Sequence, residues 1–236
     1  MFDKTAAWYD AIYGNKDYAR EARQVDELIR LHRKSDGNAL LDVACGTGAH
    51  LVHLSKIYNA EGLDADAQLL AIARERLPQV RFHLGDMCAF DLHRTFDVVT
   101  CLFSSIGYAK THERLVAAIF CCARHLRPGG VLVLEPWLVP GQFTAGYLSV
   151  EVVDRPELKI ARMQRSAVEG TVSILNFGYL VGTPGSIEHF TERHELGLFT
   201  REQMDDALRV CQLDVHYDPK GLIGRGLYVA TKAAVT

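Results

Sequence analysis

Several features that would assign the sequence to a specialised class of protein are absent. Every uninterrupted apolar run is far shorter than the roughly 20 residues of a membrane-spanning helix, and the first residues lack the apolar segment of a signal peptide. The six cysteines form no C-x-x-C pair and several lie in apolar runs, which predicts reduced thiols in a cytoplasmic protein. The net charge is only −3, so no overall positive field favours nucleic-acid binding. We therefore expect a cytoplasmic protein with neither a membrane nor a nucleic-acid partner.

Length and composition are those of a globular protein. The 236 residues are 48% apolar and 23% charged, which excludes intrinsic disorder and allows one large domain or two small ones. Up to Pro136, predicted strands alternate with predicted helices, which is typical of a parallel sheet covered by helices on both faces. The predicted strands are 38–43, 60–64, 80–84, 96–102 and 131–135, and the predicted helices are 18–34, 49–58, 67–77 and 112–126.

The pattern changes after Pro136. Four β-rich segments follow without helices between them, and glycine-containing turns separate them. These segments are 147–154, 159–169, 171–181 and 187–199. Residues 137–199 are therefore predicted to form an antiparallel β insert, a substrate lid, within a single domain.

The last part of the chain returns to the first pattern. Thr200 is expected to begin a helix that ends near Cys211, with Gln203 completing a capping box. Two further strands are predicted at 213–217 and 227–231. The predicted fold is thus a doubly wound, Rossmann-like α/β core made of residues 1–136 and 200–236, with a mainly parallel seven-stranded sheet.

A glycine loop joins the first predicted strand to its helix. It has the pattern Asp42-x-x-x-Gly46-x-Gly48, in which the glycines allow a ligand to approach the backbone closely. Leu51 stands where a dinucleotide-binding fingerprint has its third glycine, and the P-loop motif is absent. Neither a dinucleotide nor a nucleoside triphosphate is therefore predicted here.

Acidic residues follow two neighbouring strands, at the edge of the sheet where ligands bind in such folds. Asp64 ends the second strand and Asp86 follows the third. Together with Asp42 they would repel a phosphate, but they suit a cation that carries an adenosine. Asp64 can bind both ribose hydroxyls and Asp86 the adenine amino group, and S-adenosyl-L-methionine (SAM) is such a cation.

Motifs along the chain resemble those of a known protein family. The residues Asp42, Gly46, Gly48 and Asp64, with the segments 85–87 (Gly-Asp-Met) and 127–130 (Arg-Pro-Gly-Gly), resemble the class I SAM-dependent methyltransferases over essentially the whole chain. Further segments resemble the TDP-amino-sugar N,N-dimethyltransferases, namely 16–18, 41–48, 103–107, 135–137, 198–203 and 224–227. The resemblance implies N-methylation, and N,N-dimethylation, of a nucleotide-linked (TDP) 3-amino-deoxysugar. It also implies a homodimer, which nothing in the composition tests.

The resemblance also indicates which residues contact the cofactor. Tyr9 and Tyr18 match family positions that form a lid over SAM, although packing in the core explains this aromatic stripe equally well. The family pattern begins earlier than this sequence does, so we expect one aromatic contact to SAM to be either lost or replaced by Phe2. The expected cofactor-binding residues are Tyr9, Tyr18, Asp42, Ala44, Gly46, Gly48, Asp64, Asp86, Met87 and Cys101.

The loop after the fourth strand is the candidate catalytic segment. It runs from Ser104 to Tyr108, both expected catalytic residues, and lies where the methyl group of SAM should point. An amine needs only to lose its ammonium proton, so no dedicated strong base is required, and alignment of donor and acceptor dominates. A free tyrosine has a pKa of about 10 and is therefore a weak base. The roles expected for Tyr108 are to orient the amine or to relay its proton. Some relatives have histidine in this loop, and its absence leaves the base unassigned.

The expected acceptor-binding residues lie in the insert and the last loop. Arg225, between two glycines, is the best candidate for the diphosphate, and Arg162 is a weaker one. Trp137 can form a wall against the sugar, His194 can hydrogen-bond the ligand, and Tyr108 completes the set. For each residue a plain alternative stays open: a solvated surface arginine or histidine, or an aromatic that only packs the insert onto the sheet.

The sequence fits other functions less well. A SAM-dependent N- or O-methyltransferase of another small acceptor is the main alternative, but an uncharged acceptor gives no reason for a phosphate-binding arginine. A nucleic-acid methyltransferase is disfavoured because residues 103–107 lack the N/D-P-P-Y type of motif. Only an activity assay distinguishes the enzyme from a non-catalytic SAM-binding regulator. No metal is expected, since no cysteine or carboxylate completes a zinc pattern near His50 and His53.

Overall fold

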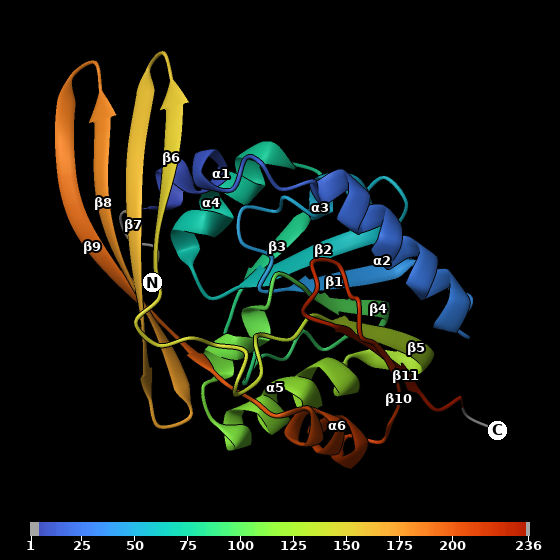
Figure 1. The fold of residues 1–236 in the computed structure, drawn as a ribbon. Helices are drawn as coiled ribbons and strands as arrows, with labels where there is room; N and C mark the ends of the chain where they lie inside the picture. The colour runs from blue at the N-terminus through green and yellow to red at the C-terminus, as the bar shows by residue number, and fades with distance from the viewer. Residues whose placement is uncertain (1–4, 235–236) are drawn as a thin grey trace.

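The computed structural model describes residues 5–234, and Phe2 lies outside them. The chain forms a seven-stranded sheet flanked by helices and a separate four-stranded antiparallel sheet (Figure 1). The core helices are η1 (Ala6–Trp8), α1 (Tyr9–Ile12), α2 (Tyr18–His32), α3 (Leu51–Leu54), α4 (Ala67–Arg76), η2 (Ser105–Ala109), α5 (His112–Arg124) and α6 (Arg201–Val210). The core strands are β1 (Ala39–Val43), β2 (Asn59–Asp64), β3 (Arg81–Leu84), β4 (Phe96–Cys101), β5 (Leu126–Leu134), β10 (Leu213–Asp218) and β11 (Leu227–Lys232).

The large sheet has the order β10-β11-β5-β4-β1-β2-β3. Strands β1 to β5 pair in parallel, whereas β11 runs antiparallel to both β5 and β10. The strand order reverses between β1 and β4, which pair directly, and such a switch point opens a ligand crevice at the carboxyl ends of the strands. The fold class predicted from the sequence is confirmed.

The strand residues alternate between two helical layers. Leu40 packs with α2, α3 and α4, whereas its neighbour Leu41 packs with α5 and α6, because successive side chains of a strand point to opposite faces. Val98 and Val99 on β4 divide in the same way. Figure 1 shows the first helical layer above the sheet and the second below it. Both faces are buried, which is why these strands are continuous apolar runs.

The second sheet is built from the insert between β5 and α6. Its strands β6 (Leu148–Arg155), β7 (Leu158–Glu169), β8 (Val172–Thr183) and β9 (Ser186–Gly197) pair antiparallel in sequence order. Its inner face buries Phe177, Tyr179 and Phe190 against Trp8 and Ile12 of the N-terminal helices. This packing holds the N-terminal segment between the two sheets, beside the carboxyl ends of the core strands.

The structure differs from the sequence prediction at several element boundaries. The predicted helix 49–58 is reduced to the short α3, and β9 ends at Gly197 rather than at Phe199. Strand β5 begins at Leu126, before the Arg-Pro-Gly-Gly segment that was expected to precede it. An irregularity in the pairing of β4 with β5 accommodates this segment, so its glycines lie within the strand instead of before it. No helix within residues 5–234 is long and apolar enough to cross a membrane.

The predicted capping box of α6 is present and gives a test of the fold. The Thr200 hydroxyl accepts from the Gln203 N–H at 3.1 Å, and the Gln203 side chain accepts from the Thr200 N–H at 2.9 Å. We expect Thr200→Ala to cost about 1 kcal/mol of stability, because it leaves a helical N–H without its partner. Thermal unfolding should show a melting temperature lower by about 2–4 °C. The control Thr95→Ala, at an exposed loop position, should melt as the wild type does, and equal melting of both variants would contradict the capping role.

Candidate active site

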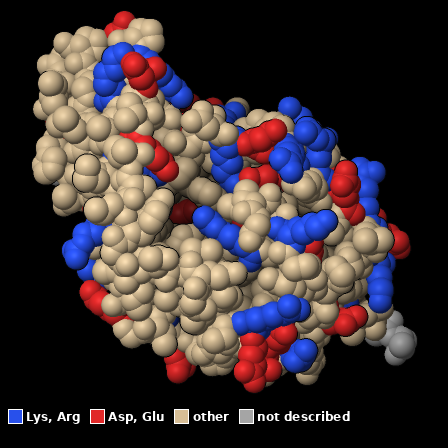
Figure 2. Space-filling view, in the orientation of Figure 1, with Lys and Arg blue, Asp and Glu red and all other residues tan. Residues whose placement is uncertain are grey.

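A cavity of about 580 Å³ lies between the carboxyl ends of the core strands and the inner face of the insert sheet. Figure 2 shows the molecule hollowed between the insert lobe and the core, with basic and acidic side chains around the hollow. The core strand ends contribute Ala44, Gly46, Asp64, Asp86 and Met87. The N-terminal segment, the η2 loop, the insert and the last loop contribute Tyr9, Tyr13, Lys16, Phe103, Ser105, Tyr108, Trp137, Glu151, Arg162, Gln164, His194 and Arg225, among others. Asp64 and Asp86 thus form an acidic side of the cavity at the core strand ends, whereas Arg162 and Arg225 lie on the side formed by the insert and the last loop, where Glu151 pairs with Arg162.

The acidic side is organised around Asp64 at the end of β2. One carboxylate oxygen of Asp64 accepts from the Gly46 N–H at 2.8 Å, and the other accepts from the Asp66 N–H at 2.8 Å. Gly46 has a φ of +56°, and a Cβ added there would meet no atom within 4 Å, so the loop leaves open space beside the backbone. Ala44 also has a positive φ, of 57°, a conformation that is uncommon outside glycine and is often stored at ligand sites. Asp64 therefore braces a strained loop while it faces the cavity.

The two acids of this side differ in their electrostatics. Burial raises the pKa of Asp64, against the hydrogen bonds from the loop backbone. Burial also opposes ionisation of Asp86, but the Cys88 N–H and the Arg114 guanidinium, 2.8 Å away, outweigh it and lower the pKa of that carboxyl. Both positions suit a ligand that brings its own hydrogen-bond donors.

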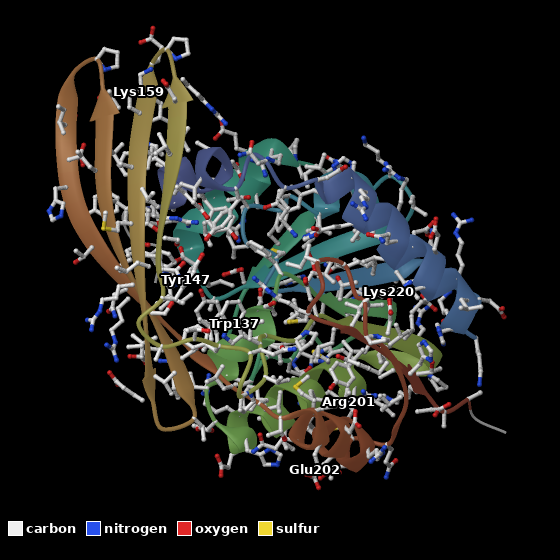
Figure 3. All side chains as sticks on the ribbon, in the orientation of Figure 1. Trp137, Tyr147, Lys159, Arg201, Glu202 and Lys220 are labelled. Carbon is white, nitrogen blue, oxygen red and sulfur yellow. The ribbon has the colours of Figure 1, made fainter. Side chains whose placement is uncertain are left out.

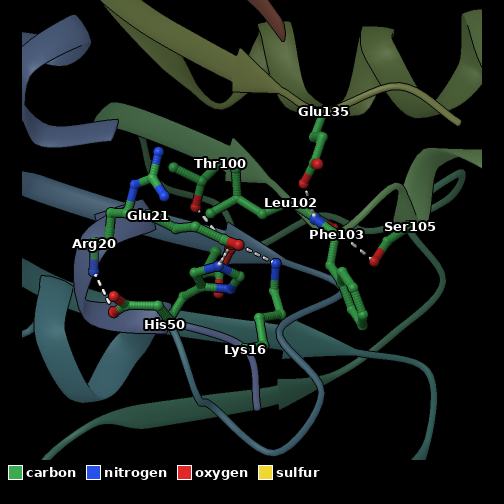
Figure 4. Close-up of polar contacts among 11 residues, drawn as sticks. Lys16, Arg20, Glu21, His50, Thr100, Leu102, Phe103, Ser105 and Glu135 are labelled. Atoms are coloured by element: carbon green, nitrogen blue, oxygen red, sulfur yellow. Dashed lines mark hydrogen bonds and ion pairs between the residues drawn. The ribbon is translucent and has the colours of Figure 1, made fainter. Parts of the chain in front are cut away.

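The loop between β4 and η2 has a strained backbone at the middle of the cavity. Phe103 and Ser104 have φ values of 54° and 59°, two consecutive residues in the left-handed region. Glu135, at the end of β5, accepts from the Phe103 N–H at 2.6 Å, and Ser105 donates to the Leu102 carbonyl at 2.8 Å (Figure 4). The strain is thus maintained by a buried carboxylate, whose pKa is raised by burial.

A cluster of charged and polar side chains contacts the loop between β4 and η2. Lys16 pairs with Glu21, and Glu21 also contacts His50 at 2.9 Å (Figure 4). The Lys16 ammonium lies 4.6 Å from the centre of the Phe103 ring. Burial opposes ionisation of Glu21, but the two basic partners lower its pKa. The N-terminal segment is therefore attached to the strained loop by charge as well as by packing.

Arg225 is the principal cation of the opposite side. One of its N–H groups donates to the Ser104 hydroxyl at 2.9 Å, and its guanidinium lies 4.6 Å from the centre of the Trp137 ring. Trp137 itself donates to the Ser173 hydroxyl at 2.9 Å and lies where insert and core meet (Figure 3). Burial lowers the pKa of Arg225, and no carboxylate among residues 5–234 forms an ion pair with it. A desolvated guanidinium with unused donors favours an anionic ligand.

Arg162 is more fully engaged by its own neighbours. It pairs with Glu151, donates to the Tyr13 hydroxyl at 3.0 Å and lies over the Tyr13 and Phe177 rings. Burial works against the charge of Arg162, but Tyr13 and Glu151 outweigh it and raise the pKa of the guanidinium. Arg162 therefore carries less unbalanced charge into the cavity than Arg225 does.

Comparison with known proteins identifies the family. A model described as a methyltransferase domain matches residues 40–130. The chain is 42% identical to dTDP-3-amino-3,4,6-trideoxy-alpha-D-glucopyranose N,N-dimethyltransferase of Streptomyces venezuelae, over 95% of this chain and 96% of that one. Its fold matches the crystal structure of Streptomyces venezuelae DesVI with a TM-score of 0.92 and 40% identity, over 98% and 99% of the two chains. It also matches SAM-bound CalS10, an amino pentose methyltransferase from Micromonospora echinaspora, with a TM-score of 0.86 and 40% identity, over 99% and 98%.

The chain belongs to this family of sugar N-methyltransferases. The family, the enzyme class and the SAM cofactor predicted from the sequence are thereby confirmed. The acidic side of the cavity fits the cofactor: Gly46 leaves room at the backbone, Asp64 can hold the ribose hydroxyls and Asp86 the adenine amino group.

Most residues predicted for this methyltransferase site face the cavity. These are Tyr9, Ala44, Gly46, Asp64, Asp86, Met87, Tyr108, Trp137, Arg162, His194 and Arg225. Five others do not line it, namely Tyr18, Asp42, Gly48, Cys101 and Ser104.

Each of these five has a visible packing role. Asp42 accepts from Thr100 at 2.7 Å behind the glycine loop, and burial raises its pKa to about 6. Gly48 faces Ala73 of α4, and Cys101 is buried in the core beneath α5. Tyr18 lies edge-on to His50, and Ser104 donates to the Pro136 carbonyl at 2.7 Å while it accepts from Arg225. These five residues therefore support the strands and loops that position the residues lining the cavity.

The structure adds residues that the sequence interpretation did not assign to the methyltransferase site. Tyr13 and Lys16 face the cavity from the N-terminal segment, and Gln164 faces it from β7. Tyr13 lies between the two assigned aromatic residues Tyr9 and Tyr18 in the sequence. Gln164 follows Arg162 by two residues on β7, and side chains two residues apart point to the same face of a strand. Within residues 5–234 no group of three potential metal ligands is present.

Proposed function

We propose that this methyltransferase transfers a methyl group from SAM to the amino group of a TDP-linked 3-amino-deoxysugar, and does so twice to give the N,N-dimethyl product. The observation that carries the proposal is the half-buried Arg225, which lines the same cavity as Asp64 and forms no ion pair with a carboxylate among the described residues. A diphosphate supplies the missing anion. When bound, SAM supplies a methyl group made electrophilic by its sulfonium sulfur.

The two-sided cavity explains how such a pair of substrates can be aligned. The acids of the core suit the cationic, adenosine-bearing cofactor, and the arginines of the insert and last loop suit the diphosphate. The amino sugar then occupies the space between them, beside Tyr108 and Trp137. In this arrangement the insert, residues 137–199, is a lid that covers the acceptor and excludes water.

The direct test is mass spectrometry of the products after incubation with SAM. The panel contains TDP-3-amino and TDP-4-amino sugars, the same amino sugars without the nucleotide, and a TDP-sugar with hydroxyl in place of the amine. We expect mass gains of one and then two methyl groups on the 3-amino nucleotide sugar alone. Methylation of the hydroxyl sugar, or equal methylation of the sugars without the nucleotide, would contradict the proposal.

We also propose that two copies of the chain form a homodimer through the outer face of the insert sheet. Val150 and Val152 on β6 are 60% and 68% exposed, and they lie opposite Met163 and Ala161 of β7. Leu180 on β8 continues the surface beside Ala161. A contiguous apolar surface of this kind marks an interaction site, and a twofold axis can pair it with itself.

Charged substitutions test this dimer. The double variant Val152→Lys with Met163→Lys should be monomeric in light scattering, because four lysines would face one another across the twofold interface. The control Leu31→Lys changes a residue that is 75% exposed on α2 and should leave the mass unchanged. A monomeric wild type, or a double variant that stays dimeric, would contradict the proposal.

Finally, we propose that the enzyme works in the cytoplasm. All six cysteines lie within the described residues and all are unpaired. Burial raises the pKa of Cys101 and of Cys122, so these thiols remain protonated and unreactive. Free thiols of this kind suit a reducing compartment.

A further inference from the structure

A chain of three hydrogen-bonding side chains leads from the cavity into the insert. The Tyr108 hydroxyl lies 2.8 Å from His194 Nδ1, and His194 Nε2 lies 3.3 Å from the Glu192 carboxylate. His194 and Glu192 are buried, and the Thr5 hydroxyl donates to Glu192 at 2.8 Å. Tyr108 comes from η2 and the other two come from β9, so the chain joins the core to the lid.

The direction of the hydrogen bonds follows from the carboxylate. Glu192 can only accept when ionised, so the His194 proton belongs on Nε2, next to it. His194 Nδ1 is then an acceptor, and the Tyr108 hydroxyl donates to it. This leaves the lone pairs of the Tyr108 oxygen available toward the cavity, which Tyr108 lines.

We propose that Tyr108, His194 and Glu192 form a proton relay that deprotonates the acceptor amine; the proposal rests on the proposed function only in that the acceptor is an amine. The ammonium passes one proton to the Tyr108 oxygen while the Tyr108 hydroxyl proton moves to His194 Nδ1. The freed lone pair of nitrogen then forms the N–C bond as the C–S bond of the sulfonium breaks, and that electron pair stays on sulfur. His194 becomes an imidazolium beside Glu192 and later releases its proton to water.

The relay resolves a difficulty for tyrosine as a base. Burial raises the pKa of Tyr108, so an isolated phenolate would not persist there. Because Tyr108 gains one proton as it loses another, the relay needs no phenolate. Tyr108 and His194 face the cavity and are candidate catalytic residues, whereas Glu192 acts through His194 and is a positioning residue. The titratable and charged groups around them are Tyr9 and Tyr13 of the N-terminal segment, Asp64 of β2, Arg162 of β7, Tyr179 of β8 and Glu192 of β9.

The test compares Tyr108→Phe, His194→Gln and Glu192→Gln with the control Glu188→Gln, an exposed glutamate on the same strand. At about pH 7 we expect kcat to fall about 100-fold for the first two variants and about 10-fold for the third, within the usual range of acid–base catalysis. At about pH 9 these losses should shrink to a few-fold, because the acceptor then arrives as the free amine. The KM for the acceptor, and the SAM Kd from calorimetry, should change little in any variant.

Three results would overturn the relay. They are a loss of kcat that is the same at both pH values, no loss at neutral pH, and a loss confined to KM or to SAM affinity. Should the buried His194→Gln fail to fold, the near-isosteric Tyr108→Phe and Glu192→Gln decide the question alone. If the wild type methylates no amino sugar, the proposed function fails; if the wild type is active and the variants show no pH-dependent rescue, only the relay fails.

Discussion

The variant Asp64→Ala is expected to bind SAM about 1000-fold more weakly than the wild type, because two charge-assisted hydrogen bonds to the ribose, each contributing about 1.5–3 kcal/mol, are lost. The structure gives a second reason for a large effect. Asp64 accepts from the backbone N–H groups of Gly46 and Asp66, so the substitution also removes two hydrogen bonds that hold the loop that the cofactor must approach. The measurement is calorimetric titration with SAM.

The design separates the lost contacts from a general loss of structure. Asp154→Ala removes a carboxylate that is 73% exposed on β6 and should leave SAM affinity unchanged. Asp64→Asn keeps one carbonyl acceptor and should lose less affinity than Asp64→Ala. Circular dichroism and thermal unfolding confirm that each variant is folded. If a folded Asp64→Ala binds SAM as tightly as the wild type, Asp64 does not hold the cofactor.

The acidic side of the site could be predicted from the sequence because its geometry is a property of parallel strands. The carboxyl ends of β1, β2 and β3 meet at one edge of the sheet, so Gly46, Asp64 and Asp86 had to come together there. The alternation of Leu40 and Leu41 between two helical layers follows from the same local rule. The local prediction that was wrong is the start of β5 at residue 131, since a pairing irregularity lets the strand include the Arg-Pro-Gly-Gly segment.

The opposite side of the site depends on packing between distant segments, which a residue pattern does not contain. Arg225 meets Ser104 and Trp137 only because the last loop, the η2 loop and the end of β5 converge. Glu192 looks like an ordinary strand glutamate in the sequence. Its carboxylate accepts from the hydroxyl of Thr5, which lies 187 residues earlier in the chain. Partners of this kind are visible only in three dimensions.

Arg225→Ala is expected to lower kcat/KM for the nucleotide amino sugar by about 1000-fold, since removing one member of a desolvated charge pair costs about 2–5 kcal/mol. The loss should appear mainly in KM, because the diphosphate lies away from the reacting nitrogen and is bound equally in the ground and transition states. SAM affinity should stay unchanged. Arg225→Lys should recover part of the loss, as it restores the charge but not the planar fork that engages two phosphate oxygens.

The control and the choice of acceptor make this result specific to the diphosphate. Lys220→Ala removes an exposed cation from the same loop (Figure 3) and should have no effect. The wild type should strongly prefer the nucleotide sugar to the same amino sugar without its nucleotide, and Arg225→Ala should abolish most of that preference. If both acceptors lose activity equally, or SAM affinity falls in parallel, Arg225 acts by holding Ser104 and Trp137 in place. The ratio between the two acceptors therefore distinguishes a diphosphate-binding arginine from a structural one.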